Sequence, residues 1–424
     1  FFFVTMTNHA NAIDEDMNGK HSEETRLDDS LIVRDVLGLI LPFLNPTELL
    51  VAERVSMLWR EVTLQTNCWL SLVGSLKVKV KFKQSLRSGL RVNCVEYHPT
   101  HPVLLCGLHD GWVYLYNCTL GEISHRIEVD PGSLEPVRAA RFLGQQAFVG
   151  GTDSGVMFWV SFRAESSDTA TWKLQTRKLW SAHDSGVLCI EVHTTLPMVL
   201  SAGNDSIIRW WDYSQNFRLV KQFQGHHAPV NAILFHPLKK AMISASSDHS
   251  VRLWEFPSTA AIHQNLTTNL ECTEPLESLY VLQQSAPAVA LSASVVKEHI
   301  WQVIVGLEGG QCAIWRMHED QHRLLGTVRH SDNVHALLIA ELFIATAGED
   351  CKLRFWHPNL LHSLGSCDIR YGGVWSLAMR DTQVAAGCSE GLLVGDVALH
   401  NVEFDVPTAK KQLFKAKRRT GGRR

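Results

Sequence analysis

The side chains best suited to chemistry in this sequence recur in sets of His, Ser or Thr, and Asp, and each set ends on a Trp. The three complete sets are His183, Ser201, Asp205 and Trp211; His226, Ser244, Asp248 and Trp254; and His330, Thr346, Asp350 and Trp356. Residues of these types could serve catalysis or bind a metal. A set that returns three times is better explained as part of a structural repeat, because a buried Asp, His or indole N–H requires a hydrogen-bond partner.

The stretches around these sets are typical of short β-strands. In the clearest one, residues 230–235 and 241–245 are apolar runs separated by a His-Pro turn, and residues 250–254 alternate apolar and polar after a polar turn. Strands this short and this close in sequence pair only as an antiparallel meander. The sequence therefore predicts a mainly β protein.

The repeat extends beyond the three sets. An aromatic residue also follows an Asp by six residues at Asp110 and at Asp153, so aromatic anchors stand at positions 116, 159, 211, 254, 315 and 356. A period of about 40 to 45 residues with four strands per unit is typical of a β-propeller blade. Counting units predicts seven blades, at residues 91–117, 137–160, 187–212, 230–255, 279–316, 334–357 and 374–397.

Two blades and the ring closure are less regular. The fifth blade is the weakest because residues 256–300 resemble an insertion, and the seventh has Asp396 in place of the aromatic anchor. Residues 76–84, LKVKVKFKQ, alternate lysine with apolar side chains, which indicates an edge strand. A phosphate-binding stripe is the alternative. We expect this strand to complete the last blade, with residues 401–406 as the competing segment.

The repeats resemble those of the WD-repeat family. Gly225-His226 stands at the Gly-His signature of that family, and Trp211-Asp212 and Trp254-Glu255 stand at its Trp-Asp signature. In that family the His, Ser or Thr, Asp and Trp of one repeat form a hydrogen-bonded chain inside a blade. The resemblance implies this structural role, and no catalytic one, for the twelve residues of the three sets.

The same resemblance implies where a target binds. The residue after each turn Asp should reach the target-binding face, and these residues are Gly111, Ser154, Ser206, His249 and Cys351. None of them is Arg or Lys. The repeated basic residues instead lie within third strands, at Arg209, Arg252 and Arg354. We therefore expect the target to be held by polar and aromatic surface rather than by an arginine cluster that binds phosphate.

Residues 30–75 predict three short helices before the propeller. Apolar residues recur at helical spacing from Val33 to Leu44, Asn45-Pro46 supplies a cap and a helix start, and Asn67 could cap the third helix. So small a core leaves apolar surface that needs a partner.

This segment resembles the F-box. The matching residues are 35–37, 43–50, Trp59-Arg60 and Trp69, whereas Ile32-Val33 replaces the opening Leu-Pro of the family and Leu58 replaces its basic residue. The resemblance implies binding to a Skp-type adaptor, and through it a cullin, by Val36, Leu37, Ile40, Leu44, Pro46, Leu49, Leu50 and Trp59. A helical cap on the propeller is the alternative.

Composition limits the remaining functions. The 424 residues carry a net charge of −3, so no global attraction to nucleic acid or membrane is expected, and no apolar run is long enough to span a bilayer. The ten cysteines include no C-x-x-C pair, which indicates reduced thiols in an intracellular protein, cytoplasmic or nuclear. Residues 1–29 predict a disordered acidic leader and residues 407–424 a flexible basic tail; nucleic acid could bind only through residues 410–424.

No motif for a phosphate loop, a hydrolase elbow or a zinc protease occurs, and we expect no catalytic residue, metal or cofactor. Two functions remain. The first is a substrate receptor of a Skp-cullin-F-box type ubiquitin ligase, with F-box-like helices on the adaptor and residues 76–406 binding an unknown protein target. The second is a WD-repeat scaffold of a nuclear or ribonucleoprotein assembly.

Overall fold

The computed structural model describes residues 76–164, 172–237, 240–256, 278, 280–297, 300–318, 321–340 and 342–401. The predicted leader, the F-box-like helices with all eight adaptor-binding residues, and the basic tail lie outside these ranges, as do residues 402–406. Within them, residues Val78–Leu399 form one compact unit.

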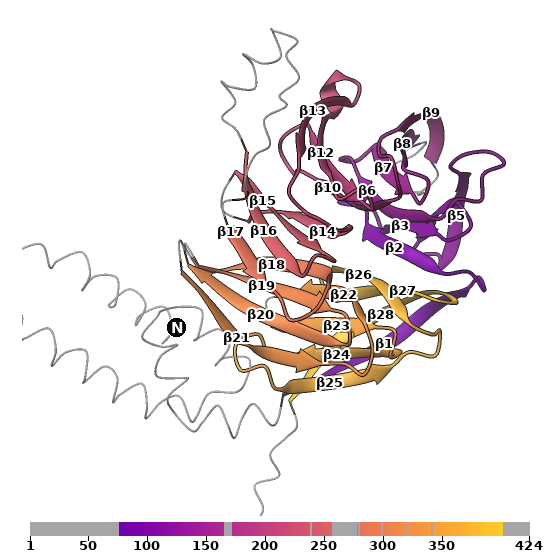
Figure 1. The fold of residues 1–424 in the computed structure, drawn as a ribbon. Coiled ribbons are helices and arrows are strands. Elements are labelled where there is room, and N and C mark those ends of the chain that lie inside the picture. The colour runs from indigo at the N-terminus through magenta and orange to yellow at the C-terminus, as the bar shows by residue number, and fades with distance from the viewer. Residues whose placement is uncertain are drawn as a thin grey trace, which may run out of the picture. The chain divides into compact units, whose positions relative to one another are not determined.

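The described strands form seven antiparallel sheets of four strands each, which we number as blades 1 to 7 (Figure 1). Blades 1 and 2 contain β2 (Val92–Tyr97), β3 (Val103–Leu108), β4 (Trp112–Asn117) and β5 (Glu122–Glu128), then β6 (Val137–Phe142), β7 (Ala147–Thr152), β8 (Val156–Ala164) and β9 (Trp172–Ser181). Blades 3 and 4 contain β10 (Val187–Val192), β11 (Met198–Gly203), β12 (Ile208–Asp212) and β13 (Arg218–Phe223), then β14 (Val230–Phe235), β15 (Ala241–Ser246), β16 (Ser250–Glu255) and β17 (Tyr280–Gln283).

The second half of the ring is built in the same way. Blades 5 and 6 contain β18 (Ala288–Lys297), β19 (Ile300–Leu307), β20 (Gln311–His318) and β21 (Gln321–Arg329), then β22 (Val334–Ile339), β23 (Ile344–Gly348), β24 (Lys352–Trp356) and β25 (Ser363–Asp368). Blade 7 contains β26 (Val374–Arg380), β27 (Gln383–Cys388), β28 (Gly391–Asn401) and β1 (Leu76–Arg87). One 3₁₀ turn, η2 (Tyr213–Gln215), links β12 to β13.

The seven blades close into a ring. Their first strands contact one another in the order β2, β6, β10, β14, β18, β22, β26 and back to β2, so these strands surround the central axis. Because successive strands alternate in direction, the start of each first strand lies at the same end of the propeller as the turn between its second and third strands. We call this end the turn end.

Burial explains why the second strands consist mostly of apolar and small residues. In β3, β11 and β15 every residue is buried, because neighbouring blades cover both faces of these strands. The fourth strands are more exposed: six of the nine residues of β21 are exposed, namely Gln321 to Leu324, Thr327 and Arg329. The apolar periodicity of the sequence therefore reflects the stacking of blades.

The edge strand predicted at residues 76–84 is confirmed as the strand that completes the last blade. β1 pairs with β28, its four lysines, Lys77, Lys79, Lys81 and Lys83, are exposed, and Val78 is buried. Lys83 forms an ion pair with Asp396. The predicted anchor position of blade 7 is wrong by one residue, because Gly395 and not Asp396 pairs with Val384 as Tyr116 pairs with Leu104. Blade 7 therefore has a glycine at its anchor position, where a side chain would have its Cβ 2.6 Å from the Lys81 carbonyl oxygen of the closing strand.

The predicted boundaries of the fifth blade were wrong. Residues 280–283 form β17, which is the outer strand of blade 4, and blade 5 begins with β18 at Ala288. The stretch 256–300 is therefore not one insertion, since 280–283 and 288–297 are strands of two blades; residues 257–277 lie outside the described ranges. A count of three strands per unit leaves out the outer strand of each blade, so it assigns β17 to blade 5 instead of blade 4.

The anchor of the second blade was also placed one residue away from its true position. Val160 pairs with Phe148 as Tyr116 pairs with Leu104, so Val160 and not Trp159 occupies the anchor position. Successive side chains of a strand point to opposite faces, so this shift by one residue places Trp159 on the other face of β8.

Candidate functional site

Each predicted set of four lies within one blade and forms an unbroken chain of hydrogen bonds. In blade 4, Trp254 Nε1–H donates to Ser244 Oγ at 2.8 Å, and Ser244 Oγ lies 2.6 Å from His226 Nε2. His226 Nδ1 lies 2.8 Å from the Asp248 carboxylate. The same chain joins, in blades 3 and 6, Trp211, Ser201, His183 and Asp205, and Trp356, Thr346, His330 and Asp350. We call these three chains the tetrads.

The chemistry of the groups fixes the direction of each chain. An indole N–H can only donate and a carboxylate can only accept, so His226 Nδ1–H donates to Asp248 and Ser244 Oγ–H donates to His226 Nε2. Ser244 is fully buried and already accepts from Trp254. The hydrogen-bonded chain therefore stabilises the blade, and the Ser244 hydroxyl cannot be reached by a substrate.

The tetrad carboxylates are ionised and the histidines neutral. Burial by itself would raise the pKa of Asp248, but hydrogen bonds from Ser250 and His226 outweigh it and lower that pKa to about 2. Burial also lowers the pKa of His226, against the attraction of Asp248. The pKa of Asp350 is lowered to about 2 in the same way, by His330 and Arg354 against burial.

The arginines of the third strands belong to the tetrads rather than to a free binding face. Arg209 Nη1 donates to Asp205, and Arg354 Nη1 to Asp350, both at 2.5 Å. Arg252 lies 3.8 Å from Asp248. These basic residues neutralise turn carboxylates and are not available as a phosphate-binding cluster.

The five residues proposed for the target-binding face lie in turns between second and third strands, at the turn end. Gly111, Ser206, His249 and Cys351 all adopt the left-handed backbone conformation, with φ between 57° and 86°. Ser154 does not share this position, because the left-handed residue of its turn is Gly155. A side chain at Gly155 would have its Cβ 2.3 Å from the carbonyl oxygen of His183, so glycine is required there.

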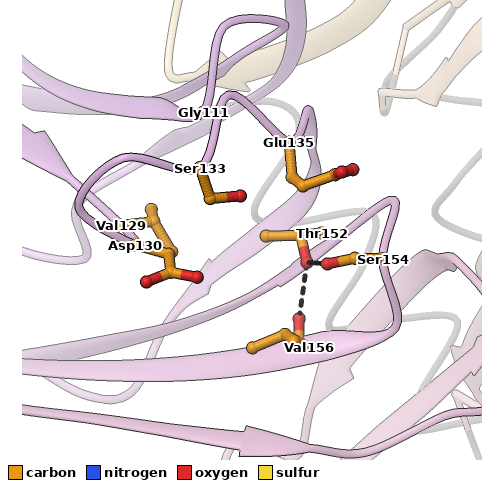
Figure 2. A pocket seen from close by; sticks show the side chains of 8 residues that line it. All are labelled: Gly111, Val129, Asp130, Ser133, Glu135, Thr152, Ser154 and Val156. Atoms are coloured by element: carbon orange, nitrogen blue, oxygen red, sulfur yellow. Dashed lines mark hydrogen bonds between the residues drawn. The ribbon is translucent and has the colours of Figure 1, made fainter.

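Two of these five residues line a shallow hollow between blades 1 and 2 (Figure 2). Figure 2 shows the loop after β5 on one side and the turn between β7 and β8 on the other; the lining residues are Gly111, Val129, Asp130, Ser133, Glu135, Thr152, Ser154 and Val156. Thr152 Oγ1 bonds Ser154 Oγ at 2.9 Å and the Val156 carbonyl at 3.1 Å. With two exposed carboxylates at its rim, the hollow suits a polar or cationic group of a partner.

A ring of β-bulges nearer the axis was not anticipated from the sequence. In every blade the pairing of first and second strands skips the second residue of the first strand; the skipped residues are Asn93, Arg138, Leu188, Asn231, Val289, His335 and Trp375. A bulge turns its side chain out of the regular ladder. In blades 2, 4, 6 and 7 that side chain bonds the first residue of the turn between second and third strands, which is Asp153, Ser247, Glu349 or Ser389.

Three blades contribute to one polar and aromatic group in this ring, Arg91, His335, Glu349 and Trp375, which we call the axial cluster. The Arg91 guanidinium lies 3.2 Å from the centre of the Trp375 ring, and the His335 ring stacks on Trp375 at 4.3 Å. His335 Nε2 donates to Glu349 at 2.7 Å, which lowers the pKa of that carboxyl. The cluster combines a cation, an aromatic ring and a carboxylate at the start of the first strands.

Sequence reasoning missed the axial cluster because it searched the turns between second and third strands. The available signal was the second residue of each first strand, where Arg138, His335 and Trp375 interrupt otherwise apolar runs. A polar or bulky residue recurring at that position in a repeat indicates a bulge whose side chain faces away from the stacked sheets.

No helix within the described ranges is long and apolar enough to cross a membrane. In the same ranges, no three His, Cys, Asp or Glu residues lie together so that they could hold a metal ion. The eight cysteines of this part of the chain are free thiols.

Comparison with known families agrees with this geometry. Residues 80–117, 174–212 and 217–255 match the family "WD domain, G-beta repeat". Each match runs from the outer strand of one blade to the third strand of the next, so β1 occupies the place that β9 and β13 occupy in the other two. The chain therefore contains WD40 repeats within a seven-bladed β-propeller, an architecture typical of non-catalytic protein-interaction scaffolds.

One relative is similar to this chain over a single stretch. Over 74 residues the chain is 35% identical to the coatomer subunit beta' of Drosophila melanogaster. That stretch covers 18% of this chain and 8% of the relative, so the chain spans far less than two thirds of the length of that protein.

Proposed function

We propose that this chain is a non-catalytic scaffold that holds a protein partner at the turn end of its propeller. The observation that carries this proposal is the axial cluster, in which Arg91 and Trp375 stack at the start of the first strands. Arg and Trp are, with Tyr, enriched among the residues that dominate binding energy at protein interfaces. The tetrads, by contrast, have their polar groups committed to one another.

At a finer level, we propose that the scaffold is the substrate receptor of a Skp-cullin-F-box type ubiquitin ligase, acting in the cytoplasm or nucleus. Support for this role comes from the sequence of residues 30–75, where 43–50 and Trp59-Arg60 match the F-box pattern. In this arrangement the helical segment binds the adaptor and the propeller presents the target.

Co-purification with a Skp-type adaptor and a cullin tests the finer role. We expect the double variant Leu49→Asp with Leu50→Asp to lose the adaptor, because a carboxylate buried at an apolar contact costs several kcal/mol. Leu134→Asp is the matched control: Leu134 is a leucine of the propeller that is 75% exposed, so its variant should keep the adaptor. Absence of adaptor from the wild-type preparation would contradict the ligase role and leave the scaffold role standing.

The second candidate is a scaffold of a nuclear or ribonucleoprotein assembly that is anchored by the basic residues 410–424. The eight basic side chains of this tail and the absence of any acidic one favour it. The similarity to one stretch of a coatomer subunit is compatible with an assembly role of another kind. If the tail is the anchor, removing residues 407–424 should release the protein from its assembly, whereas the substitutions at Leu49 and Leu50 should leave it bound.

A further inference from the structure

Arg91 is unusual in this propeller because its guanidinium is half-buried and has no polar partner. The Nε atom is fully buried without a hydrogen bond, and none of the described residues forms an ion pair with the side chain. Burial, together with repulsion from Arg138, lowers the pKa of Arg91 to about 10, so the group remains charged at neutral pH. The two Nη groups are not buried and hydrogen-bond no described residue, so they are the donors that an acceptor from outside can reach.

The position of Arg91 is fixed in advance of any ligand. Its side chain stacks on the Trp375 ring, and Trp375 Nε1–H donates to Ser389 Oγ at 3.0 Å. The Arg91 carbonyl accepts from the His109 backbone N–H at 3.0 Å. A cation held in this way loses little conformational freedom on binding, so an acceptor would gain most of the energy of the hydrogen bonds.

The surrounding charges favour an acceptor with a single negative charge. Arg138, the next arginine of the ring, is already engaged by Asp153 through two hydrogen bonds of 3.0 and 2.8 Å. Glu349 lies close enough to interact electrostatically with Arg91 and adds a negative charge to the site. Glu349 would repel a phosphate dianion about twice as strongly as it repels a single carboxylate, and a dianion would need at least two free cations. One carboxylate matches one planar guanidinium, so the single free cation of Arg91 favours the carboxylate.

We propose that the axial cluster binds an Asp or Glu side chain of an acidic segment in a partner protein, with Arg91 donating to the carboxylate and Trp375 supporting Arg91 from behind. This inference rests on the proposed scaffold function and specifies the chemistry of the partner. It places the central contact at the axis, away from the hollow between blades 1 and 2, where Asp130 and Glu135 would repel an acidic segment.

Fluorescence anisotropy with the full chain tests this assignment. The probes are three peptides: hexaglutamate, hexaglutamine, and hexaglutamine with phosphoserine at two of its positions. Each peptide is labelled at the N-terminus and amidated at the C-terminus. We expect hexaglutamate to bind, hexaglutamine not to bind, and the phosphoserine peptide to bind no more tightly than hexaglutamate. Arg91→Gln should weaken hexaglutamate binding about tenfold or more, since it removes a charge-assisted hydrogen bond.

The matched control is Arg126→Gln in blade 1. Arg126 also lies over an aromatic ring, Tyr114, at 5.5 Å, but it is exposed on the outer strand β5. It should leave hexaglutamate binding unchanged. Trp375→Phe keeps an aromatic surface under Arg91 and loses the bond to Ser389, so it should weaken binding by less than Arg91→Gln does. Melting curves of all variants establish that each is folded.

Three results would overturn the proposal. The first is a lack of hexaglutamate binding to the wild-type chain. The second is equal hexaglutamate binding after Arg91→Gln, which would place the peptide elsewhere, such as on the lysines of β1. The third is binding of the phosphoserine peptide through Arg91 that is at least tenfold tighter than that of hexaglutamate. None of these results decides the scaffold role itself. That role falls only if no protein partner co-purifies with the wild-type chain.

Discussion

The tetrads and the axial cluster are both polar groups at the turn end of the propeller, yet they differ in how completely their atoms are paired. In blade 4 a single chain of hydrogen bonds runs from Trp254 to Asp248 and satisfies each group in it. In the axial cluster, Arg91 remains without an acceptor. Because burying an unpaired polar group costs free energy, complete pairing indicates a structural role. An unpaired cation that is only half-buried, as Arg91 is, indicates instead a site that a partner can reach.

Blade 5 sharpens this comparison. Trp315 occupies the anchor position there, but Val305 and Gly309 replace the Ser and Asp of a tetrad, and the buried Trp315 Nε1–H has no partner among the residues described. The blade still folds as four strands. A tetrad therefore adds stability to a blade without being required to form one.

The largest difference in stability between the tetrads and the axial cluster should come from removing the tetrad indole. Trp254→Ala deletes a side chain that is 1% exposed and leaves a cavity in the apolar cluster that it shares with Phe223 and Met242. We therefore expect the free energy of unfolding to fall by about 3 to 5 kcal/mol in urea titrations. Trp375→Ala removes an indole that is only partly buried. Equal losses for the two variants would contradict the division between structural and binding residues.

A smaller loss should follow from removing the tetrad carboxylate. Asp248→Ala leaves His226 without its acceptor and should lower the free energy of unfolding by about 1 to 3 kcal/mol. The control is Asp184→Ala, since Asp184 is exposed and forms no hydrogen bond to another described residue. An unchanged melting temperature for Asp248→Ala would show that the tetrad does not stabilise the blade.

Acid should weaken the propeller through the buried histidines. Burial lowers the pKa of His98 to about 4 and also lowers the pKa of His226, so the folded state disfavours their protonation and stability falls as pH drops below about 6.5. Asp248, with its pKa lowered to about 2, adds a further loss between about pH 3.8 and 2. Glu96 acts in the opposite sense, because burial, against Arg141, raises its pKa to about 7.

Since buried histidines outnumber such carboxyls, we expect the urea midpoint to fall steadily from pH 7 to pH 4.5. A midpoint that stays constant or rises over this interval would contradict the conclusion that neutral, buried histidines dominate the response of the fold to acid.

Much of the architecture was predictable from the sequence because blades repeat. The recurring His, Ser or Thr, Asp and Trp positions located three tetrads, and the alternation of lysine with apolar residues identified β1 as the closing strand. Blade boundaries failed where the pattern is degenerate: β17 is a four-residue outer strand far from β16 in sequence, and Trp159 mimics an anchor one residue away from Val160.

The axial cluster could not be predicted in the same way. Its members come from blades 6 and 7 and from the residue before β2, so they are separated by more than 240 residues in sequence and meet only because the ring closes. Arg91 precedes a strand and stands outside the repeat positions that were compared. The N-terminal segment 30–75 remains a sequence-based prediction.

A paired measurement on Asp248→Ala and Arg91→Gln tests the central claim most directly. For each variant, the free energy of unfolding and the affinity of the folded protein for hexaglutamate are measured in the same buffer. We predict that Asp248→Ala loses about 1 to 3 kcal/mol of stability and keeps its affinity, whereas Arg91→Gln changes stability by less than about 0.5 kcal/mol and loses affinity about tenfold. If Arg91→Gln destabilises the fold as much as Asp248→Ala, or if Asp248→Ala weakens binding as much as Arg91→Gln, the distinction between paired structural groups and an unpaired binding group is wrong.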